Sequence, residues 1–510
     1  MTRSPGDIEQ RGLEAPLLHP SGGSNASSFH HSEAALKSNF WDCTLNLTKV
    51  ILGAGIMALP RAVALLGWGA GLALLLSVGV LTHFTVHGLV YASDRLKQDT
   101  YSGLVRAALG PLPEKVLQLA MLFGCLGFEV VYVDIIGDLL LGEAPQWDGL
   151  ITTWLPAEDR TLWFVGRPFV LLLLAALVLA PLASLRTMGH LGAVNAVGLL
   201  SLVFFAGTTV WLGAAAALQG TGHSLPAAPD WGALGRDTAS RATALLAVVP
   251  ILLTAASCHQ SVHPLRAMLH PYSGAALDRI VALSLAAVTA LFLVVTFAAY
   301  TAFGSDIRGN FLNNLSVPEL APLLGATAAP FVSFGIKGGY AVSLVGSAVL
   351  IMFPLRQSLL EMLVPAEAVP GGPPVRATLY LGCTYGLLAT VYVIAVFVPS
   401  IWDVISFVGA VACTIMCFII PGLLLVKYKD QRTWSHWAQR AAARAVVLLG
   451  VLLFLNVFVG LYMNAAKPAP AAQPPVGTGL LGAGAAGMEG TGPGADGGVW
   501  ELAKWAGWGA

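Results

Sequence analysis

Charged side chains are scarce in this chain of 510 residues. Asp, Glu, Lys and Arg make up 11% of it, whereas a soluble domain contains roughly 25%. Hydrophobic residues make up 56% of the chain, and its formal net charge is zero. This composition excludes a water-soluble globular protein. It predicts an all-α membrane protein with many spans, because a helix satisfies its own backbone groups in lipid.

Cysteines and catalytic patterns are sparse as well. The six cysteines all lie in or beside apolar segments, and no CxxC or Cys/His spacing suggests a disulfide framework or a metal site. The sequence contains no nucleophile–base pattern and no cofactor-binding loop. We therefore expect neither an enzyme nor a resident cofactor, and no nucleic-acid partner.

Eleven apolar segments are long enough to cross a bilayer, since a spanning helix needs about 20 residues. They lie at about 41–64, 68–92, 114–141, 165–183, 188–217, 240–268, 276–303, 329–361, 376–398, 401–427 and 441–464. No signal peptide precedes them, so the first segment must direct insertion itself. Lys and Arg are about twice as frequent in the loops on the side of the N-terminus, which predicts a cytosolic N-terminus.

The spans lie between two polar or low-complexity tails. We expect residues 1–38 to be a disordered cytosolic tail and 39–464 to be the transmembrane domain. Residues 465–510, rich in Gly, Ala and Pro, form the predicted outer tail. A glycosylation sequon begins at Asn314, in a predicted outer loop.

The first span contains residues that favour a break in the helix. It reads Asn46-Leu-Thr-Lys-Val-Ile-Leu-Gly-Ala-Gly-Ile-Met-Ala-Leu-Pro60, with Gly53 and Gly55 ahead of the proline. Glycine and proline favour a break, and the freed backbone groups then need polar partners inside the membrane. Half-helix ends at mid-membrane commonly bind a substrate or an ion. The alternative is a glycine-rich face that packs closely against another helix.

A second interrupted helix lies five spans later. Pro250, the polar run from Thr254 to Ser261 and Pro264 interrupt the segment 240–268, and His259 lies at this break. Two interrupted helices at equivalent positions of two five-helix halves predict an inverted repeat. One helix remains outside the repeat.

Ionisable side chains at membrane depth are costly and therefore suggest function. Lys49, one turn before Gly53, either belongs to a site or extends to the cytosolic surface. Glu129, near the middle of the third span, either pairs with a cation such as Lys49 or carries a proton. Ser343 and Ser347 lie one turn apart, and their hydroxyls either ligate a hard cation or bond to their own helix.

Three further charged residues have less specific interpretations. Asp134 and Asp138 share a face of the third span, and we interpret Asp138 as a carboxylate at the outer interface. Lys337, in the outer part of its span, is interpreted as an anchor that extends to the membrane surface.

Several stretches together resemble the amino acid/auxin permease superfamily, especially its sodium-coupled neutral amino acid transporter branch and the plant AVT-type vacuolar amino acid transporters. The resemblance covers about 40–464. The residues that carry it are Phe40, Asn46-Leu-Thr48, Gly53-Ala-Gly-Ile-Met-Ala-Leu-Pro60, Thr100-Tyr-Ser-Gly-Leu-Val105, Ile136-Gly-Asp138, Pro181-Leu-Ala-Ser-Leu-Arg186, Cys258-His-Gln-Ser-Val-His-Pro264, Tyr300-Thr-Ala-Phe-Gly304, Phe353-Pro-Leu-Arg356 and Val398-Pro-Ser-Ile-Trp-Asp403.

This resemblance implies a LeuT-type fold that carries amino acids with sodium or protons. The substrate's carboxylate would meet the backbone amides of Ala54, Gly55 and Ile56, where the positive end of a half-helix favours an anion. Its amino group would meet carbonyls around Thr254 and Ser257. At the family's sodium position, the ligands would be backbone carbonyls near Lys49 and Leu52 and the side chains of Ser343 and Ser347.

Two features depart from the sodium-coupled pattern. Lys49 stands where those members typically have Asn, and a lysine there resembles the proton-coupled branch. Its tethered ammonium can occupy the space of a sodium ion. Glu129 and Asp134 are also unusual in the third span, so proton coupling competes with sodium coupling.

We predict a secondary active transporter that moves amino acids across a membrane by alternating access, as a symporter or an exchanger. Its partners would be an amino acid and the lipid bilayer, its coupling ion H⁺ or Na⁺, and its assembly state a monomer. The alternative is a membrane-embedded amino acid sensor with little transport. The sequence leaves open which amino acids are carried, and whether the membrane is vacuolar, lysosomal or plasma membrane.

Overall fold

The computed structural model describes residues 38–53, 55–142, 147–156, 158, 160, 162–185, 192–232, 234, 237–363, 377–397, 401–428 and 434–465. The two predicted tails, at 1–38 and 465–510, fall outside these residues except for Ser38 and Ala465. Their predicted disorder therefore stays a prediction.

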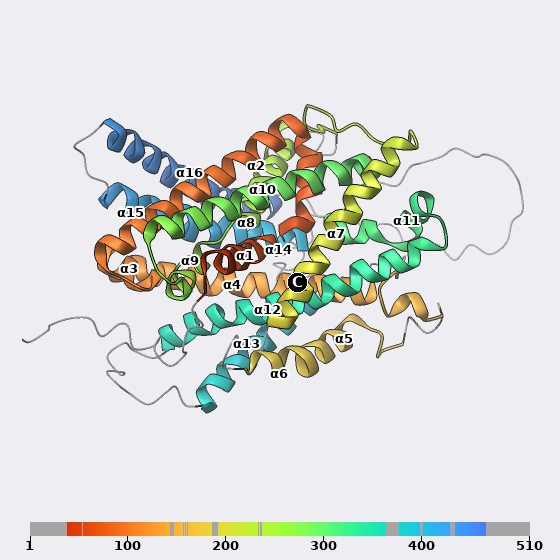
Figure 1. Ribbon diagram of the computed structural model, residues 1–510, viewed down its shortest axis with the longest axis horizontal. Helices are drawn as coiled ribbons and strands as arrows, with labels where there is room; N and C mark the ends of the chain where they lie inside the picture. Colours follow the sequence, from red (N-terminus) through yellow and green to blue (C-terminus); the bar gives the residue numbers. More distant parts are fainter. Residues whose placement is uncertain are drawn as a thin grey trace, which may run out of the picture.

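Helices make up nearly all of the described chain, and it contains no β-sheet (Figure 1). The helices are α1 (Phe40–Leu52), α2 (Gly55–Leu96), α3 (Tyr101–Leu109), α4 (Pro111–Leu141), α5 (Arg167–Leu173), π-helical η4 (Leu174–Leu179), α6 (Ala180–Ala183), α7 (Gly192–Leu218), α8 (Thr238–Ala255), α9 (His259–Met268), α10 (Gly274–Phe303), η7 (Phe311–Leu315), α11 (Val317–Leu324), α12 (Ala328–Leu363), α13 (Ala377–Phe397), α14 (Ile401–Val408), π-helical η9 (Gly409–Ile419), α15 (Ile420–Tyr428) and α16 (Trp434–Ala465).

Eight helices in the described part of the chain are long and apolar enough to cross a membrane. A shorter apolar helix covers Arg167–Ala183. The segments predicted at 41–64 and 240–268 contain broken helices instead of continuous ones. The predicted count of eleven spans and the inverted repeat therefore stay predictions, while an all-helical membrane architecture is confirmed.

Both interruptions expected from the sequence are present, but the prolines do not cause them. α1 ends at Leu52 and α2 begins at Gly55, whereas Pro60 lies inside α2. Likewise α8 ends at Ala255 and α9 begins at His259, while Pro250 and Pro264 lie inside these helices. The chain therefore leaves helical geometry at small residues, where the neighbouring helices approach closely.

α2 contains both the second half of the first predicted span and the whole second span. Its direction changes at Gly67, whose φ of 71° is in the left-handed region that glycine adopts without steric cost. The Trp68 N–H next to it donates to the Pro226 carbonyl, at 2.9 Å. This bond holds the turn against the connection between α7 and α8.

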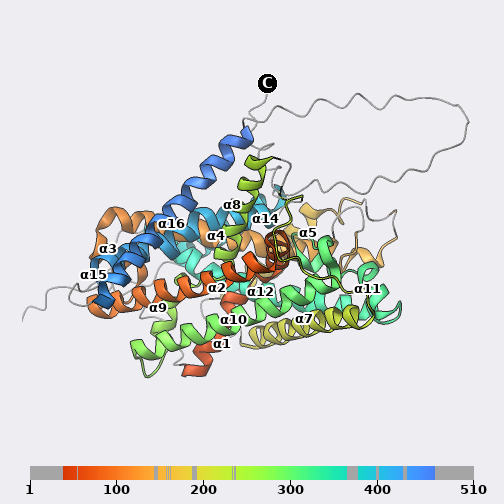
Figure 2. The ribbon, with the colours of Figure 1, turned by 90° about the horizontal axis from the view of Figure 1, so that it is seen from above.

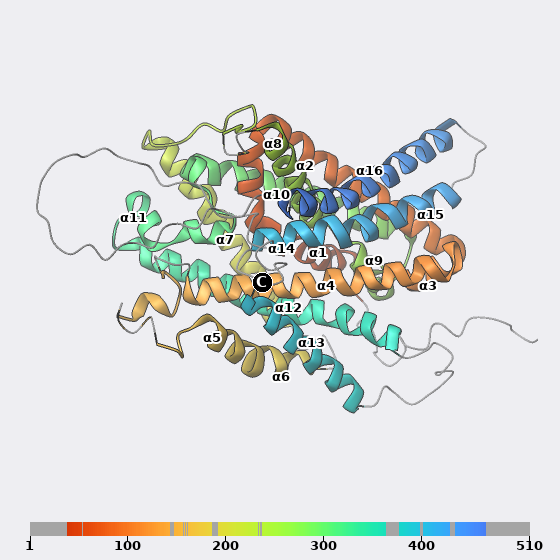
Figure 3. The same cartoon turned by 180° about the vertical axis from the view of Figure 1, so that it is seen from behind.

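The two broken helices lie inside a frame of longer helices. α4 packs along α12, and α10 lies between α2 and α7 (Figures 1 and 3). α16 packs on η9 and α15, on the side of the bundle opposite α1 (Figure 2). The frame brings α4, α7, α12 and η9 around the two breaks.

On the predicted cytosolic side, the ends of α1, α2 and α9 are tied together. Ser38 pairs with the end of α9 through Ser38 N–H to Met268 O, at 2.9 Å, and His270 N–H to Ser38 O, at 3.1 Å. Arg266 forms an ion pair with Asp94, and Tyr272 donates to Asp94 Oδ1 at 2.6 Å. Burial and this bond raise the pKa of Tyr272, so its hydroxyl remains a donor.

Candidate functional site

The two helix breaks lie directly against each other. A Cβ atom placed on Gly55 would stand 2.7 Å from the Cα atom and 2.8 Å from the Cβ atom of Ala255. The start of α2 therefore touches the end of α8 with no room for a side chain. The fold thus brings Gly55 against Ala255, which lies between the predicted site residues Thr254 and Ser257 in sequence. Ala54 lies outside the described residues.

Two tyrosines fill the break between α1 and α2. The Tyr340 hydroxyl, from α12, donates to the Gly53 carbonyl at 2.9 Å. The Tyr132 hydroxyl, from α4, lies 2.8 Å from where a Cβ on Gly53 would stand. Because the break frees the Gly53 carbonyl from helical bonding, Tyr340 supplies the donor that this group needs in lipid.

At the other break, the predicted hydroxyls bond to backbone carbonyls. Thr254 Oγ1 donates to Pro250 O at 2.7 Å and contacts Ile405 O at 3.3 Å. Ser257 Oγ donates to Thr254 O at 3.0 Å. These bonds cap the end of α8, and they link it to α14. Both hydroxyls are therefore engaged in this conformation.

His259, the first residue of α9, is fully buried. Its Nε2 atom lies 3.0 Å from Thr85 Oγ1 on α2. Its Nδ1 atom has no hydrogen-bond partner among the described residues. The contact with Thr85 attaches the start of α9 to α2.

The predicted ion-site residues, apart from Glu129, line one small cavity. Its wall is formed by Lys49, Leu52 and Gly53 of α1, Gly198 and Leu202 of α7, and Tyr340, Ser343, Leu344 and Ser347 of α12. The cavity has a volume of about 10 Å³. That volume holds about one water molecule or one small ion and excludes an amino acid.

Lys49 and Ser343 meet beside Gly198. The position that a Cβ on Gly198 would take lies 2.8 Å from Ser343 Oγ and 3.2 Å from Lys49 Nζ. Ser347 Oγ donates to Ser343 O at 3.2 Å, which is the helix-bonded alternative expected for this pair. The ammonium of the partly buried Lys49 thus lies beside Gly198 of α7 and the Ser343 hydroxyl of α12.

Glu129 lies apart from this cavity. Its side chain is buried in α4, with 1% exposure, and its Oε2 atom has no hydrogen-bond partner in the described structure. Its electrostatic neighbours are Cys125 and Tyr132 of the same helix. The structure therefore does not pair Glu129 with Lys49, and Tyr132 lies between the carboxyl and the Gly53 break.

Comparison with known proteins identifies the family. A family model described as "Transmembrane amino acid transporter protein" matches residues 36–463. The chain belongs to this family. It is 28% identical to amino acid transporter AVT6A of Arabidopsis thaliana, over 89% of this chain and 93% of the relative. It is 26% identical to AVT6E over 84% of both, and 27% identical to AVT6B over 88% and 94%.

The family and these relatives are transporters and not enzymes. Together with the eight apolar helices, this makes the chain an integral multi-pass membrane protein. The resemblance to AVT-type transporters is confirmed by these matches.

The two aspartates of α4 belong to a buried ionic network. Arg167 Nη1 donates to Asp138 Oδ1 at 2.7 Å, and Arg167 Nη2 forms an ion pair with Asp134. Asn310 Nδ2 donates to Asp138 Oδ2 at 3.3 Å. Asp138 is thus not a lone interfacial carboxylate. Arg167 lies at the start of the segment predicted at 165–183, and it is 29 and 33 residues from the two aspartates in sequence.

Two other residues predicted on the outer side are buried. Lys337 is buried, and its Nζ atom donates to Asp148 O at 2.6 Å instead of extending to the surface. Asn314 is 1% exposed, its Nδ2 donates to Asp306 O at 2.9 Å, and its Oδ1 accepts from Arg308 N. Glycosylation of Asn314 stays a prediction, and it requires release of this buried amide.

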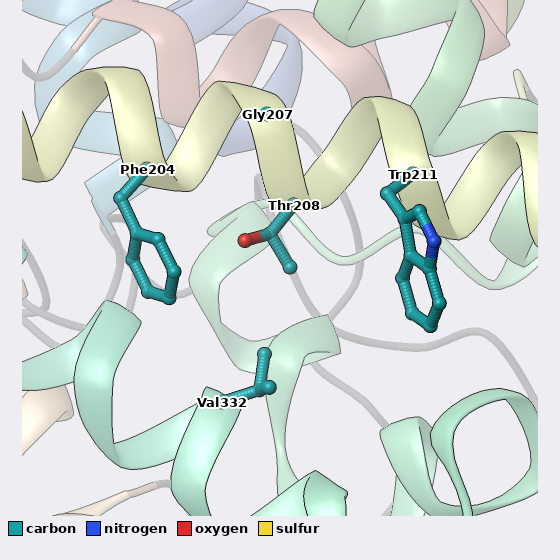
Figure 4. A pocket seen from close by; sticks show the side chains of 5 residues that line it. All are labelled: Phe204, Gly207, Thr208, Trp211 and Val332. Carbon is teal, nitrogen blue, oxygen red and sulfur yellow. The ribbon is translucent and has the colours of Figure 1, made fainter.

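A larger cavity, of about 290 Å³, lies between α7 and α12 away from the breaks. Phe204, Gly207, Thr208 and Trp211 of α7 line it with Val332 of α12 (Figure 4). Thr208 offers the one side-chain hydroxyl of this lining. An amino acid zwitterion needs polar partners for two charges. This cavity, lined mainly by apolar side chains, therefore does not fit an amino acid.

Proposed function

We propose that this protein is a secondary active amino acid transporter that works by alternating access. The observation that carries the proposal is the contact between the two helix breaks, at Gly55 and Ala255, beside a cavity of the size of one ion. The names of its relatives, which are amino acid transporters, support this reading. The proposal includes eleven spans, a LeuT-type inverted repeat, a cytosolic N-terminus and a monomer.

The amino acid would bind across the two breaks. The backbone amides at the start of α2, from Gly55 and Ile56, carry the positive end of a helix dipole and suit a carboxylate. The carbonyls at the end of α8, around Thr254 and Ser257, carry the negative end and suit an ammonium. Two half-helices of opposite polarity in contact thus match the charges of a zwitterion.

The coupling ion would act at the cavity beside Lys49. A sodium ion about 4 Å from a charged ammonium is repelled by about 4 kcal/mol at an effective dielectric constant of about 20. That energy corresponds to roughly a thousandfold loss of affinity. We therefore propose that Lys49 replaces sodium and that protons provide the coupling, with Glu129 as the carboxyl that takes up the proton.

Uptake into proteoliposomes tests the proposal. Purified protein would be reconstituted, and a panel of labelled neutral, acidic and basic amino acids would be offered under an imposed pH or sodium gradient. We expect saturable uptake of at least one amino acid class. Absence of uptake across the whole panel by folded, reconstituted protein would overturn the transporter proposal and favour the amino acid sensor.

A further inference from the structure

Tyr340 contacts both the proposed ion cavity and the break between α1 and α2. It precedes Ser343 by three residues and Ser347 by seven on α12, so all three share a helix face. Its side chain is 2% exposed and lines the cavity of Lys49. Its hydroxyl donates to Gly53 O at 2.9 Å, and its ring centroid lies 5.8 Å from that of Phe205.

Tyr132 approaches the same break from α4, the helix that packs along α12. It is 6% exposed, and its hydroxyl lies 2.8 Å from where a Cβ on Gly53 would stand, at the residue whose carbonyl accepts from Tyr340. On α4, Tyr132 is three residues from Glu129 and also interacts with it electrostatically. The Gly53 break therefore lies against Tyr340, which lines the Lys49 cavity, and against Tyr132, which is three residues from the buried Glu129 on α4.

We propose that Tyr340 and Tyr132 are positioning residues that join the Lys49 cavity to Glu129 across the Gly53 break. This inference rests on the proposed transport function. Tyr340 ties the break to α12 through its hydrogen bond to Gly53 O, and Tyr132 packs against the break from α4, which carries Glu129. A change of charge at the Lys49 cavity or at Glu129 then alters the backbone conformation at Gly53. The tyrosines fix positions and transfer no proton.

Removal of one hydroxyl isolates this role. In Tyr340→Phe the ring still packs on Phe205, while the Gly53 carbonyl loses its donor. We expect accumulation driven by a pH gradient to fall about fivefold to tenfold, the loss that one hydrogen bond explains. Exchange of labelled for unlabelled substrate at equal pH should change less than about twofold. Tyr132→Phe should act in the same direction.

The matched control is Tyr392→Phe, in a partly buried tyrosine of α13. It should leave both accumulation and exchange unchanged. Full accumulation by Tyr340→Phe would overturn the inference. So would an equal loss of accumulation and exchange, because it would indicate a role in folding or binding alone. If the wild type itself shows no gradient-driven uptake, the proposed transport function is wrong. This result is distinguishable from a failure of the tyrosine proposal, in which the wild type transports and the variants behave like it.

Discussion

At the scale of single residues, the proposed site depends on glycines. The neighbouring atoms at these glycines are so close that no side chain would fit there. Gly55 contacts Ala255 through backbone and Cβ atoms, and Gly53 contacts the hydroxyls of Tyr132 and Tyr340. Small residues at these positions let two half-helices meet at their ends, which is the arrangement that brings opposite dipole charges together.

Gly55→Ala tests this close approach. The added methyl would stand 2.7 Å from Ala255 Cα, well inside the usual contact of about 3.5–4.0 Å. Because the obstacle is backbone, the ends of α2 and α8 must separate. We expect uptake to fall at least about tenfold, with a stability loss of about 1–3 kcal/mol. Uptake would be measured per folded protein, as judged by size-exclusion chromatography.

Gly338→Ala is the control for this substitution. Gly338 lies inside α12, and no atom lies within 4 Å of where its Cβ would stand. It should retain wild-type uptake. Normal uptake by Gly55→Ala would contradict the view that the contact between the breaks matters for transport.

At the scale of elements, the π-helical segment η9 forms a wall beside the break of α8. A Cβ on Gly409 would overlap Thr254 Oγ1 and Pro250 O. Cys413, one turn further along η9, is fully buried. π-helical turns are frequent at functional sites, and this one places small residues where α8 ends.

Gly409→Ala should therefore displace α8 from η9. Since the displaced carbonyls are those proposed to bind the substrate's amino group, we expect the KM for uptake to rise several-fold. Kinetics of uptake over a range of substrate concentrations would measure it. Gly386→Ala on α13, where no atom lies within 4 Å of the added Cβ, is the control. An unchanged KM for Gly409→Ala would contradict a role of η9 at the proposed substrate site.

The sequence predicts the two helix breaks at this scale, and the reason is local. Glycines and a polar run inside apolar segments identify the two breaks, and the grouping of Lys49, Ser343 and Ser347 follows the family resemblance. The tyrosines, Arg167 and η9 could not be found in this way. In the sequence, Tyr132 and Tyr340 look like ordinary residues on the apolar face of a helix. Their role depends on which helices pack around Gly53. Likewise, the Arg167 pairs join residues far apart in sequence.

At the scale of the whole molecule, the outer ionic network connects α4, α5 and the segment at η7. Arg167 joins Asp134 and Asp138, and Asn310 bonds to Asp138. The two aspartate side chains are 1% and 7% exposed. Without Arg167 both buried carboxylates would lose the cation that pairs with them.

Arg167→Ala should therefore destabilise the folded protein. Breaking a buried pair costs about 3–5 kcal/mol, and we expect the lower end because Arg167 is 26% exposed. A fall in Tm of several degrees in detergent would report it. Arg308→Ala is the control. Arg308 Nη2 lies 3.5 Å from Glu319 Oε1, and this ion pair is more exposed than those of Arg167. Such a pair contributes about 0–1 kcal/mol to stability. Equal Tm values for both variants would contradict this view of the network.

We propose that Lys49 replaces sodium in a proton-coupled amino acid transporter. The most direct test is uptake into proteoliposomes with pH and sodium gradients imposed separately, for wild type, Lys49→Ala, Glu129→Gln and the controls Lys115→Ala and Glu319→Gln, at exposed positions. We predict uptake driven by pH alone in the wild type and in the controls, and its loss in the Lys49 and Glu129 variants. Uptake that requires sodium and survives in Lys49→Ala would contradict the account.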